Sequence, residues 1–415
     1  MCLANILPFL PLALALSPNI QVSGNTCTVA PLGGGKDDGP NIRTAFQMCG
    51  SRSTIVLDGT YTIGTVLVTT GLDNVRIKFT GSFNFAPNTT YWTENAYFMG
   101  YQNASTFWFL SGQHVHLCGG GTLNGNGQVW WDALANNSAG VAGGSSTTFA
   151  RPVLLTVGNA SHVWIDGIQQ VNPPSWNNFI YQSTDVTYTN INISVASRDS
   201  NPAKNTDGWD IYRSSRIHIT DSIVNNTDDC VAFKPNTTHV KIVNLWCGGS
   251  HGISVGSLGQ YAGVSDVVEH VHSINVTMIN GENGARIKTF AGSADPHSIA
   301  GGGSGYVRDV TFQNFQLTNI NFPILIDQCY FSSADTCAKY PSQVNISDIH
   351  FIDIIGTSSG KEGDLVADLE CSAALPCHGI TATGTHLVPG TNSTMYYCKS
   401  VADVGKLDFD CVPPS

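Results

Sequence analysis

The stretches "RIHITDSIV" (216–224) and "HVKIVNLWC" (239–247) both alternate apolar with polar residues, as half-buried β-strands do. Ile217 and Val240 stand at equivalent positions in the two stretches, 23 residues apart. A repeat of about 20 to 30 residues, built of short strands and polar turns, is typical of a solenoid whose coils stack on one another. We therefore predict an all-β fold, a right-handed parallel β-helix.

The same pattern recurs along the chain, and Val163 and Val186 are again 23 residues apart. Comparable runs lie at 162–168, 185–195, 271–279, 307–317 and 345–355. A β-sandwich is the alternative, but it would show hairpin signals at closer spacing, and few are present. One short helix is expected in "DDGPNIRTAFQMCG" (37–50), where Pro40 and Gly50 punctuate its two ends and where it would cap the open end of the core.

The chain has 415 residues, of which 42% are hydrophobic and only 12% are charged, and no change of composition divides it. Its start contains the apolar run "NILPFLPLALAL", which is too short for a transmembrane helix of about 20 residues. We predict a signal peptide over residues 1–23 and a single domain over 24–415. The basic residues expected before such a run are missing, so a buried N-terminal strand is the alternative.

Cysteine usage also indicates a secreted, extracellular protein. Of the 12 cysteines, Cys2 would leave with the signal peptide, so 11 remain and at least one thiol should be free. Cys118 is far from any other cysteine and is our candidate for the free thiol. Pairing nearest neighbours would give 27–49, 230–247, 329–337, 371–377 and 398–411, although the sequence alone does not prove this connectivity.

Sequons for N-linked glycans are also typical of the secretory route. They begin at Asn88, Asn103, Asn136, Asn159, Asn192, Asn225, Asn236, Asn275, Asn345 and Asn392. The net charge of −11 disfavours nucleic acid as a partner, and we expect neither a nucleic-acid nor a membrane partner. Such a charge would also oppose a polyanionic substrate unless cations cluster locally. We expect a monomer.

Aspartates recur at the spacing of the coils. Asp207 in "NTDGWDIY" (205–212) precedes Asp228 in "NNTDDCVAFK" by 21 residues, and Asp229 precedes His251 in "GGSHGISVGSLG" by 22. Residues one coil apart lie about 4.8 Å apart in a β-helix, so these side chains should converge. Crowded carboxyl groups hold one proton more tightly, which suits glycoside hydrolysis by an acid and a base. The alternative is a set of aspartates that cap backbone amides at turns.

Two cations follow in "NGARIKTFAG" (283–292). Arg286 and Lys288 are two residues apart, so on a strand they face the same side. They would supply the local positive charge that an acidic protein needs to hold an acidic sugar. A surface strand carrying salt bridges is the alternative.

The motifs "NTDGWD", "DDCVAFK", "GSHGISVGSLG" and "RIK" resemble, in this order, those of the polygalacturonase family of glycoside hydrolases, most closely the fungal exo-polygalacturonases. The resemblance implies an inverting hydrolase of α-1,4-galacturonosyl bonds in polygalacturonate or pectin that needs no cofactor or metal. It implies these roles: Asp228 as general acid, Asp207 and Asp229 as the groups that activate water, His251 as support for the acid, and Arg286, Lys288, Tyr330 and Asn205 as substrate-binding residues.

Two features favour exo action. Gly208 stands where enzymes that cut within the chain more often carry Ala, and "YWTENAYFMGYQNASTFWFL" (91–110) resembles an exo-type insertion whose aromatics would wall off one end of a cleft. These aromatics could instead belong to the core. Trp209 departs from the Phe expected in the motif.

Several other functions stay open. Within the fold they are an endo-polygalacturonase and a xylogalacturonan hydrolase, whereas a rhamnogalacturonan hydrolase usually lacks the Arg-x-Lys pair. Outside this activity they are a calcium-dependent pectate lyase and a non-catalytic carbohydrate-binding solenoid. For the hydrolase we expect an acidic pH optimum, because one of the crowded carboxyl groups must be protonated.

Overall fold

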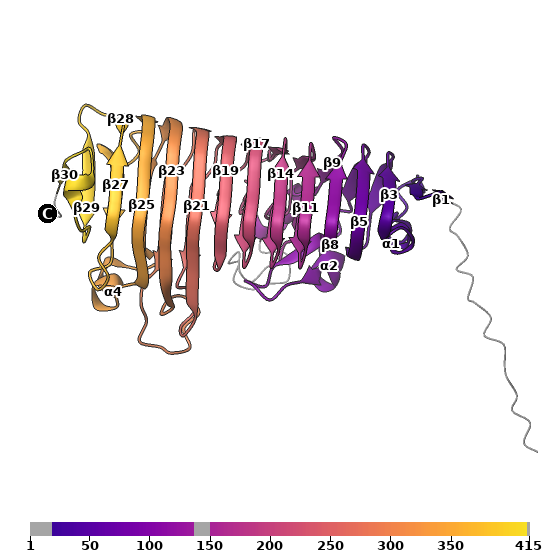
Figure 1. The fold of residues 1–415 in the computed structure, drawn as a ribbon, viewed down its shortest axis with the longest axis horizontal. Helices are drawn as coiled ribbons and strands as arrows, with labels where there is room; N and C mark the ends of the chain where they lie inside the picture. The colour runs from indigo at the N-terminus through magenta and orange to yellow at the C-terminus, as the bar shows by residue number, and fades with distance from the viewer. Residues whose placement is uncertain (1–18, 137–149, 413–415) are drawn as a thin grey trace, which may run out of the picture.

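The computed structural model describes residues 19–136 and 150–412, and the strands of these segments join into one sheet that winds into a parallel β-helix. The predicted fold is confirmed. Figure 1 shows coils stacked in chain order along one long axis, from the indigo N-terminal end to the yellow C-terminal end. The two residue pairs that the 23-residue spacing predicts are register partners on adjacent strands: Val163 pairs with Val186, and Ile217 pairs with Val240.

The coils present three faces. The first face contains β2 (Thr26–Val29), β3 (Ser51–Leu57), β5 (Leu67–Phe79), β8 (Ser105–Cys118), β11 (Ser161–Asp166), β14 (Thr184–Thr189), β17 (Ser215–Asn225), β19 (Thr237–Gly248), β21 (Ser265–Ile279), β23 (Ser304–Ile320), β25 (Gln343–Ser358) and β27 (His378–Thr383). The second face contains β4 (Thr60–Ile63), β6 (Ser82–Phe85), β9 (Thr122–Asn124), β12 (Gln169–Val171), β15 (Asn192–Ser194), the later parts of the long strands from β17 on, and β28 (His386–Val388).

The third face carries the site described below. It follows the first parts of β5 and β8 with β10 (Val153–Gly158), β13 (Asn178–Tyr181), β16 (Trp209–Tyr212), β18 (Val231–Phe233), β20 (Ile253–Leu258), β22 (Asn283–Phe290), β24 (Phe322–Tyr330), β26 (Leu365–Glu370), β29 (Met395–Lys399) and β30 (Cys411–Val412). Two short strands, β1 (Ile20–Ser23) and β7 (Tyr97–Phe98), pair antiparallel with β2 and β8.

Asparagine and aspartate form the corner between the first and second faces. Asp221, Asn244 and Asn275 occupy this corner on successive coils with φ of 52°, 58° and 58°. Asn and Asp are the non-glycine residues that tolerate this left-handed conformation best. Their side chains also bond from coil to coil, since Asn244 donates to Asp221 (2.8 Å) and Asn275 donates to Asn244 (2.6 Å). The Asn-rich turns of the sequence thus become ladders that hold the coil register.

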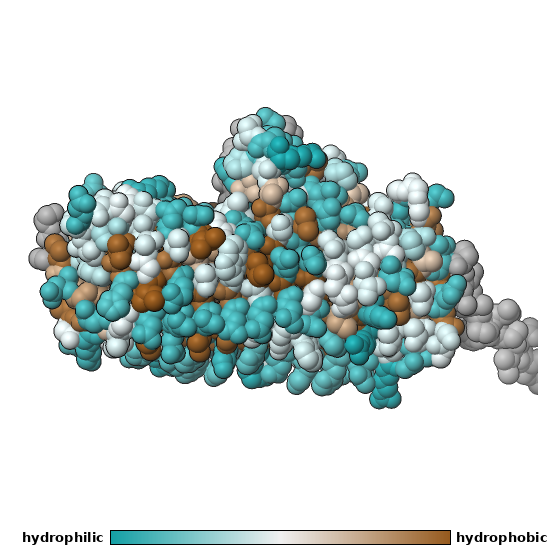
Figure 2. Space-filling view, turned by 90° about the horizontal axis from the view of Figure 1, so that it is seen from above, coloured by the Kyte–Doolittle hydropathy of each residue, from teal (hydrophilic) through white to brown (hydrophobic). Residues whose placement is uncertain are grey.

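A continuous hydrophobic core fills the solenoid and includes residues from Ile20 to Leu407. On the outside, hydrophilic and hydrophobic residues are intermixed along the body when the molecule is seen from above (Figure 2). The predicted helix is confirmed as α1 (Gly39–Met48), which lies at the N-terminal end and buries Ile42, Ala45 and Phe46. The sequence did not predict the other helical elements, α2 (Thr89–Asn95), α3 (Gln128–Ala135), α4 (Ala334–Lys339) and the 3-10 turn η1 (Val404–Lys406).

The predicted disulfides all form. Sulfur pairs join residues 27–49, 230–247, 329–337, 371–377 and 398–411. Cys118 is free and buried, as predicted. Nearest-neighbour pairing follows from the solenoid, because residues close in sequence lie on the same or adjacent coils.

The predicted signal peptide falls largely on residues 1–18, which lie outside the described residues. Its last four residues form β1, and Ile20 is buried there. Cleavage after residue 23 would remove this strand, whereas cleavage before Asn19 would keep it. None of the helices in the described segments is long and apolar enough to cross a membrane.

Candidate active site

The three aspartates lie where strands of the third face begin. Asp207 and Asp229 each stand two residues before a strand, β16 and β18, and these strands pair in parallel. The Gly208 amide donates to the Asp229 carbonyl (3.0 Å), and the His251 amide donates to the Asp228 carbonyl (2.9 Å). These backbone bonds bring successive coils into register, so residues 21 and 22 positions apart meet.

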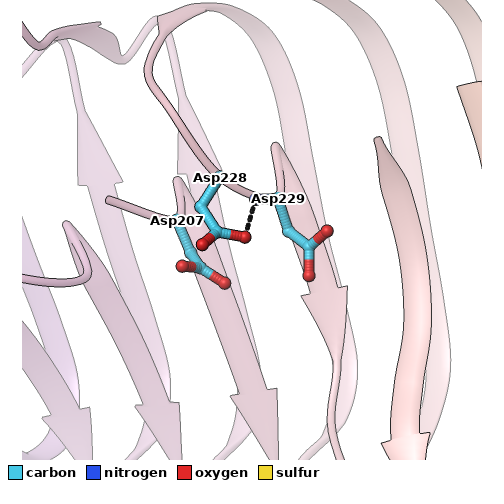
Figure 3. A group of neighbouring side chains, drawn as sticks. All are labelled: Asp207, Asp228 and Asp229. Carbon is cyan, nitrogen blue, oxygen red and sulfur yellow. Dashed lines mark hydrogen bonds between the residues drawn. The ribbon is translucent and has the colours of Figure 1, made fainter. Parts of the chain in front are cut away.

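The side chains converge as the sequence predicts. Each of Asp207, Asp228 and Asp229 offers one carboxylate oxygen within 4.8 Å of an oxygen of the other two. Figure 3 shows the Asp207 and Asp228 carboxyl groups side by side, with the Asp229 amide bonded to Asp228 (2.9 Å). Asp207 and Asp229 are buried, whereas the Asp228 side chain is 18% exposed. Asp228 is therefore the member of the cluster that solvent reaches.

His251 contacts the exposed carboxyl. Its Nδ1 lies 3.2 Å from Asp228 Oδ1, and its Nε2 lies 3.8 Å from Glu282 Oε2. Burial alone would lower the pKa of His251, but the hydrogen bond and charge of Asp228 raise it. Burial alone would raise the pKa of Asp228, but the hydrogen bond and charge of His251 hold it well below its usual range. In the free site this pair therefore carries its proton on His251.

Two other aspartates of the site, Asp207 and Asp210, have raised pKa values. The pKa of Asp207 is raised well above its usual value, first by burial and then by the charges of Asp210 and Asp228. Burial likewise raises the pKa of Asp210 to about 7. Lys234 moderates both, because its Nζ lies 2.9 Å from Asp210 Oδ1 and 4.0 Å from Asp207 Oδ2. Burial thus favours the neutral form of both Asp207 and Asp210 in the free site.

Sequence reasoning assigned no role to Asp210 or Lys234, although both stand inside the quoted motifs. The signal that could have marked them is a charged residue within or directly after a short apolar strand: Asp210 lies in β16, and Lys234 follows β18. Asp210 and Lys234 are polar residues on the outward side of buried strands, where an unpaired charge would be costly. An ion pair across adjacent coils offsets the two charges, with Lys234 Nζ 2.9 Å from Asp210 Oδ1.

Arg286 and Lys288 lie on the same side of β22, as predicted, and both point to Asp229. Lys288 Nζ donates to Asp229 Oδ2 (2.7 Å), and Arg286 Nη1 lies 3.7 Å from Asp229 Oδ1. Ser254 also donates to Asp229 Oδ1 (2.6 Å). The Tyr330 ring centroid lies 5.4 Å from both cationic groups, so the predicted tyrosine belongs to this end of the site.

Asn205 connects the site to a residue that the sequence analysis missed. Its amide Nδ2 donates to Asp228 Oδ2 (3.2 Å), while its Oδ1 accepts from Arg151 Nη2 (2.6 Å). Arg151 is buried, and its Nη1 also donates to the carbonyls of Pro174 (2.9 Å) and Lys204 (2.6 Å). Burial lowers the pKa of Arg151 to about 10. No motif marks Arg151, because it lies 54 residues before Asn205 and reaches it only through the fold.

Three carboxylates offer enough oxygen ligands for a cation, but their partners do not suit one. Both Asp229 oxygens are already bonded, to Ser254 and Lys288, and Lys234 lies 4.0 Å from Asp207. A divalent ion at this point would face the ammonium groups of both lysines. The residues therefore fit a cluster neutralised by lysines better than a metal centre.

Part of the aromatic insertion lies over the third face. Residues 97–104, here called the 97–104 loop, begin with β7 on the edge of β8. Tyr101 stacks on Tyr212 of β16 with ring centroids 4.0 Å apart, and Gln102 Nε2 donates to Gln260 Oε1 (2.9 Å), just beyond β20. The loop thus spans from the N-terminal coils to the far ends of the strands that carry the aspartates.

Both interpretations of the 91–110 stretch apply, to different residues. Trp92, Phe107 and Trp108 are fully buried in the main core. Tyr97 and Phe98 are exposed by 37% and 43%, and Tyr101 belongs to a separate apolar cluster on the third face. The insertion is therefore anchored by its ends and presents its middle to the site.

Glycoside hydrolases use a pair of carboxyl groups that differ in proton affinity. The third face of the β-helix presents such carboxyl groups, with cations next to them. The sequence pattern of glycosyl hydrolases family 28 matches residues 50–407, and the chain belongs to this family.

Named relatives are similar over most of their length. The probable exopolygalacturonase X of Aspergillus fumigatus is 40% identical over 410 residues, which cover 97% of this chain and 91% of that protein. Exopolygalacturonase B of Aspergillus niger is 41% identical over 366 residues, covering 88% and 80%. The crystal structure of an endo-xylogalacturonan hydrolase from Aspergillus tubingensis matches with a TM-score of 0.80 and 32% identity, covering 94% of this chain and 99% of that one.

Proposed function

We propose that the protein is a secreted, exo-acting hydrolase of α-1,4-galacturonosyl bonds in polygalacturonate or pectin, and that it releases galacturonic acid. The observation that carries the proposal is the convergence of three carboxyl groups within 4.8 Å beside His251, Arg286 and Lys288. Two relatives that are named exopolygalacturonases support the substrate and the mode.

In the proposed reaction a water oxygen attacks the anomeric carbon while the glycosidic oxygen leaves. Asp228 gives its proton to the leaving oxygen, and the water gives a proton to Asp207 or Asp229. Asp228 suits the acid role because it alone of the three faces solvent, with its side chain 18% exposed. A leaving oxygen in the cleft reaches Asp228 before the two buried carboxyls.

In the free site the pKa of Asp228 is low and that of Asp207 is raised, so Asp228 must receive a proton when the sugar binds. A bound sugar covers Asp228 and removes it from water, which favours the neutral carboxyl. The proton then moves from Asp207 to Asp228 over less than 4.8 Å, and Asp207 becomes the ionised group that receives the water proton. One proton exchange thus prepares both the acid and the base.

The cations next to the cluster are the proposed site for the galacturonate carboxylate. The Arg286 side chain is 12% exposed and can offer a guanidinium edge, while Lys288 adds a charge from its buried position. Tyr330 would border the sugar, since its ring lies beside both cations. Asn205 would contact the substrate next to Asp228, to which its amide is bonded. No metal or cofactor takes part in the proposal.

The 97–104 loop supports exo action. It packs on the third face through the Tyr101–Tyr212 stack at the end of β16, the strand that follows Asp207, and is tied to the residue after β20 by Gln102 and Gln260. A polymer that enters the site would meet this loop and could extend only away from it. The enzyme would therefore cleave the polymer at a chain end, one residue at a time.

We propose inversion of the anomeric centre on the resemblance of the motifs. The spacing of the carboxyl groups does not itself indicate inversion. Their closest oxygens lie within 4.8 Å, nearer to the roughly 5 Å of retaining enzymes than to the about 6.5–9.5 Å of inverting ones. The buried position of Asp207 and Asp229 behind Asp228 favours activation of a water over direct attack on the sugar. Product stereochemistry therefore tests this part of the proposal.

A xylogalacturonan hydrolase is the second candidate, because the A. tubingensis enzyme matches 94% of this chain at a TM-score of 0.80. Chromatography of early products separates the two. Polygalacturonate and a xylose-substituted galacturonan would be offered in parallel. We expect galacturonic acid as the main early product of polygalacturonate. Longer oligomers at the start, or products from the substituted polymer alone, would contradict the proposal.

Secretion is supported by the five disulfides and by the relatives. Glycans are proposed at the sequons, most of which are exposed; Asn236 and Asn345 are half-buried. Intact mass before and after glycosidase treatment measures their number.

A further inference from the structure

The first face carries a row of outward side chains that the proposed reaction does not use. Register pairs place His116, Trp164, Thr187, His218 and Lys241 side by side on successive coils. The next row along these strands contains His162, Arg216 and His239. Nine of the twelve histidines of the chain lie on this face: His114, His116, His162, His218, His239, His270, His272, His350 and His378.

These rows enclose a hollow of about 440 Å³. Among the residues that line it are Trp164, Thr187, Arg216, His218, His239 and His162. Thr187 is smaller than its neighbours, so its coil leaves a gap between Trp164 on one side and His218 on the other. Coils are about 4.8 Å apart, so the backbones at Trp164 and His218 are about 10 Å apart, with Thr187 between them.

Trp164 is held rigidly although it faces solvent. It is 48% exposed, its ring stacks on His116 with centroids 4.8 Å apart, and its Nε1 donates to Thr189 Oγ1 (3.1 Å). The stack covers one face of the indole and leaves the side toward Thr187 bordering the hollow. A fixed aromatic surface beside a polar hollow suits the apolar C–H face of a sugar ring.

The charges around the hollow favour an anion. Arg216 binds Asp185 with two hydrogen bonds (2.7 and 2.9 Å), and His162 Nε2 lies 3.8 Å from the same carboxylate. Five titratable groups line the hollow: His162, Asp185, Arg216, His218 and His239. The flanking groups are Arg76, His114, His116, Asp166, Lys241, Glu269 and His270.

Cations and histidines outnumber carboxylates in this set. Because histidine is the side chain that gains charge as pH falls from 8 to 5, the face becomes more positive in mildly acidic solution. Carboxyl groups with ordinary pKa values of about 4 remain ionised there, so an acidic polymer keeps its charge. Asp166 also stays ionised, because hydrogen bonds from Asn190 and Thr189 lower its pKa.

We propose that this hollow is a second carbohydrate site, which binds a segment of acidic polysaccharide by stacking on Trp164 and by contacts with Arg216, His218 and His239. It lies on the first face, whereas the aspartates lie on the third, so a bound polymer leaves the cleft free. The site would hold the enzyme on its polymer between cleavage events. The choice of a uronic-acid polymer rests on the proposed function, but binding does not require hydrolysis.

The test is retardation in gels that contain polygalacturonate, with Asp228→Asn as the background so that the polymer is not consumed. We expect Trp164→Ala to weaken binding at least about threefold at pH 5, and His218→Gln to do so at pH 5 more than at pH 8. Ile223→Ala is the matched control, because Ile223 is equally exposed (48%) but belongs to the second-face part of β17. It should bind as the background does.

In the active background, Trp164→Ala should hydrolyse a short soluble oligogalacturonide within about twofold of the wild-type rate, since it does not touch the cleft. Failure to hydrolyse any substrate would overturn the proposed function and leave the binding comparison intact. Unchanged retardation of both Trp164→Ala and His218→Gln would overturn the second site. Retardation that is equally strong in a neutral polymer gel would overturn its preference for an acidic one.

Discussion

At the residue scale, three chemically identical side chains acquire different roles from their surroundings. Asp229 is enclosed by Ser254, Lys288 and Arg286, Asp207 is buried beside Asp210, and Asp228 faces solvent next to His251. The first environment surrounds the carboxyl with a hydroxyl and two cations, the second raises the pKa of its carboxyl by burial, and the third lowers the pKa of a carboxyl that a bound substrate would cover. In the proposed reaction these differences, and not the motif alone, divide the work of acid and base.

Asp228→Asn removes the acid and keeps the shape of the side chain. We expect kcat to fall about 10²- to 10⁴-fold, the range for loss of a general acid. Asp221→Asn, at an exposed corner, should keep full activity. Initial rates on polygalacturonate measure both, with circular dichroism as the check on folding. Turnover of Asp228→Asn within about tenfold of wild type would take the acid role from Asp228.

Arg151 is expected to act through Asn205 as a positioning residue. Its donation to Asn205 Oδ1 turns the amide NH₂ toward Asp228, a bond at 3.2 Å. Arg151→Lys should lower kcat about 10-fold with little change in KM, as loss of a supporting contact typically does. It should also shift the pH profile of kcat/KM, because the amide helps keep Asp228 ionised in the free site.

The melting temperature separates this role from a structural one. Arg151 also satisfies the carbonyls of Pro174 and Lys204, so Arg151→Met should be less stable than Arg151→Lys. If Arg151→Lys lost stability but kept the wild-type kcat and pH profile in its folded fraction, Arg151 would be structural only.

At the scale of elements, periodicity decided what could be predicted. The strands and the disulfides follow from the repeat of the coils, because each coil constrains the next through its register, whereas α1 is marked by Pro40 and Gly50 at its two ends. Helices α2, α3 and α4 lie in insertions that this repeat does not reach. Gln128–Ala135, for example, is only eight residues long and follows Asn126 and Gly127, which fit a loop equally well.

The same limit applies to the site. Asp207, Asp228, Asp229 and His251 lie one coil apart without insertions, so their convergence could be predicted. The contacts of Arg151 with Asn205 and of Gln102 with Gln260 join residues 54 and 158 positions apart. Such distances include inserted loops of irregular length, so no spacing rule locates these contacts. These two contacts could therefore be identified only from the folded structure.

The 97–104 loop provides the element-scale prediction. Tyr101→Ala combined with Gln102→Ala removes both the stack on Tyr212 and the bond to Gln260. We expect the loop to open and dimers and trimers of galacturonic acid to join the monomer among early products. Glu94→Ala, exposed on α2, is the control and should release monomer as wild type does. Monomer alone from the double variant would show that the loop does not set the exo mode.

At the scale of the whole molecule, buried acids couple stability to pH. Asp368 on the third face has its pKa raised to about 7, first by burial and then by the charges of Glu370 and Asp327, and Asp210 behaves similarly. The unfolded chain releases these protons near pH 4. Their stabilising contribution is therefore complete below about pH 4 and is lost as pH rises toward 7.

We accordingly expect a higher melting temperature at pH 5 than at pH 8. Asp368→Asn has no proton to lose, so it should reduce the difference between the two pH values, by about 1–3 °C. Calorimetry of wild type and variant at both pH values measures this. A wild-type protein that melts higher at pH 8 would contradict the protonated state assigned to the buried acids. This stability range agrees with the acidic pH optimum that we expect.

In the proposed function, one cluster of aspartates, assembled from successive coils, hydrolyses galacturonosyl bonds from a chain end with water as nucleophile. Time-resolved proton NMR of polygalacturonate during the first turnovers tests it most directly. We expect monomeric galacturonic acid whose β-anomer appears first and then equilibrates with the α-anomer. Initial α-anomer, internal oligomers or an unsaturated sugar would contradict it.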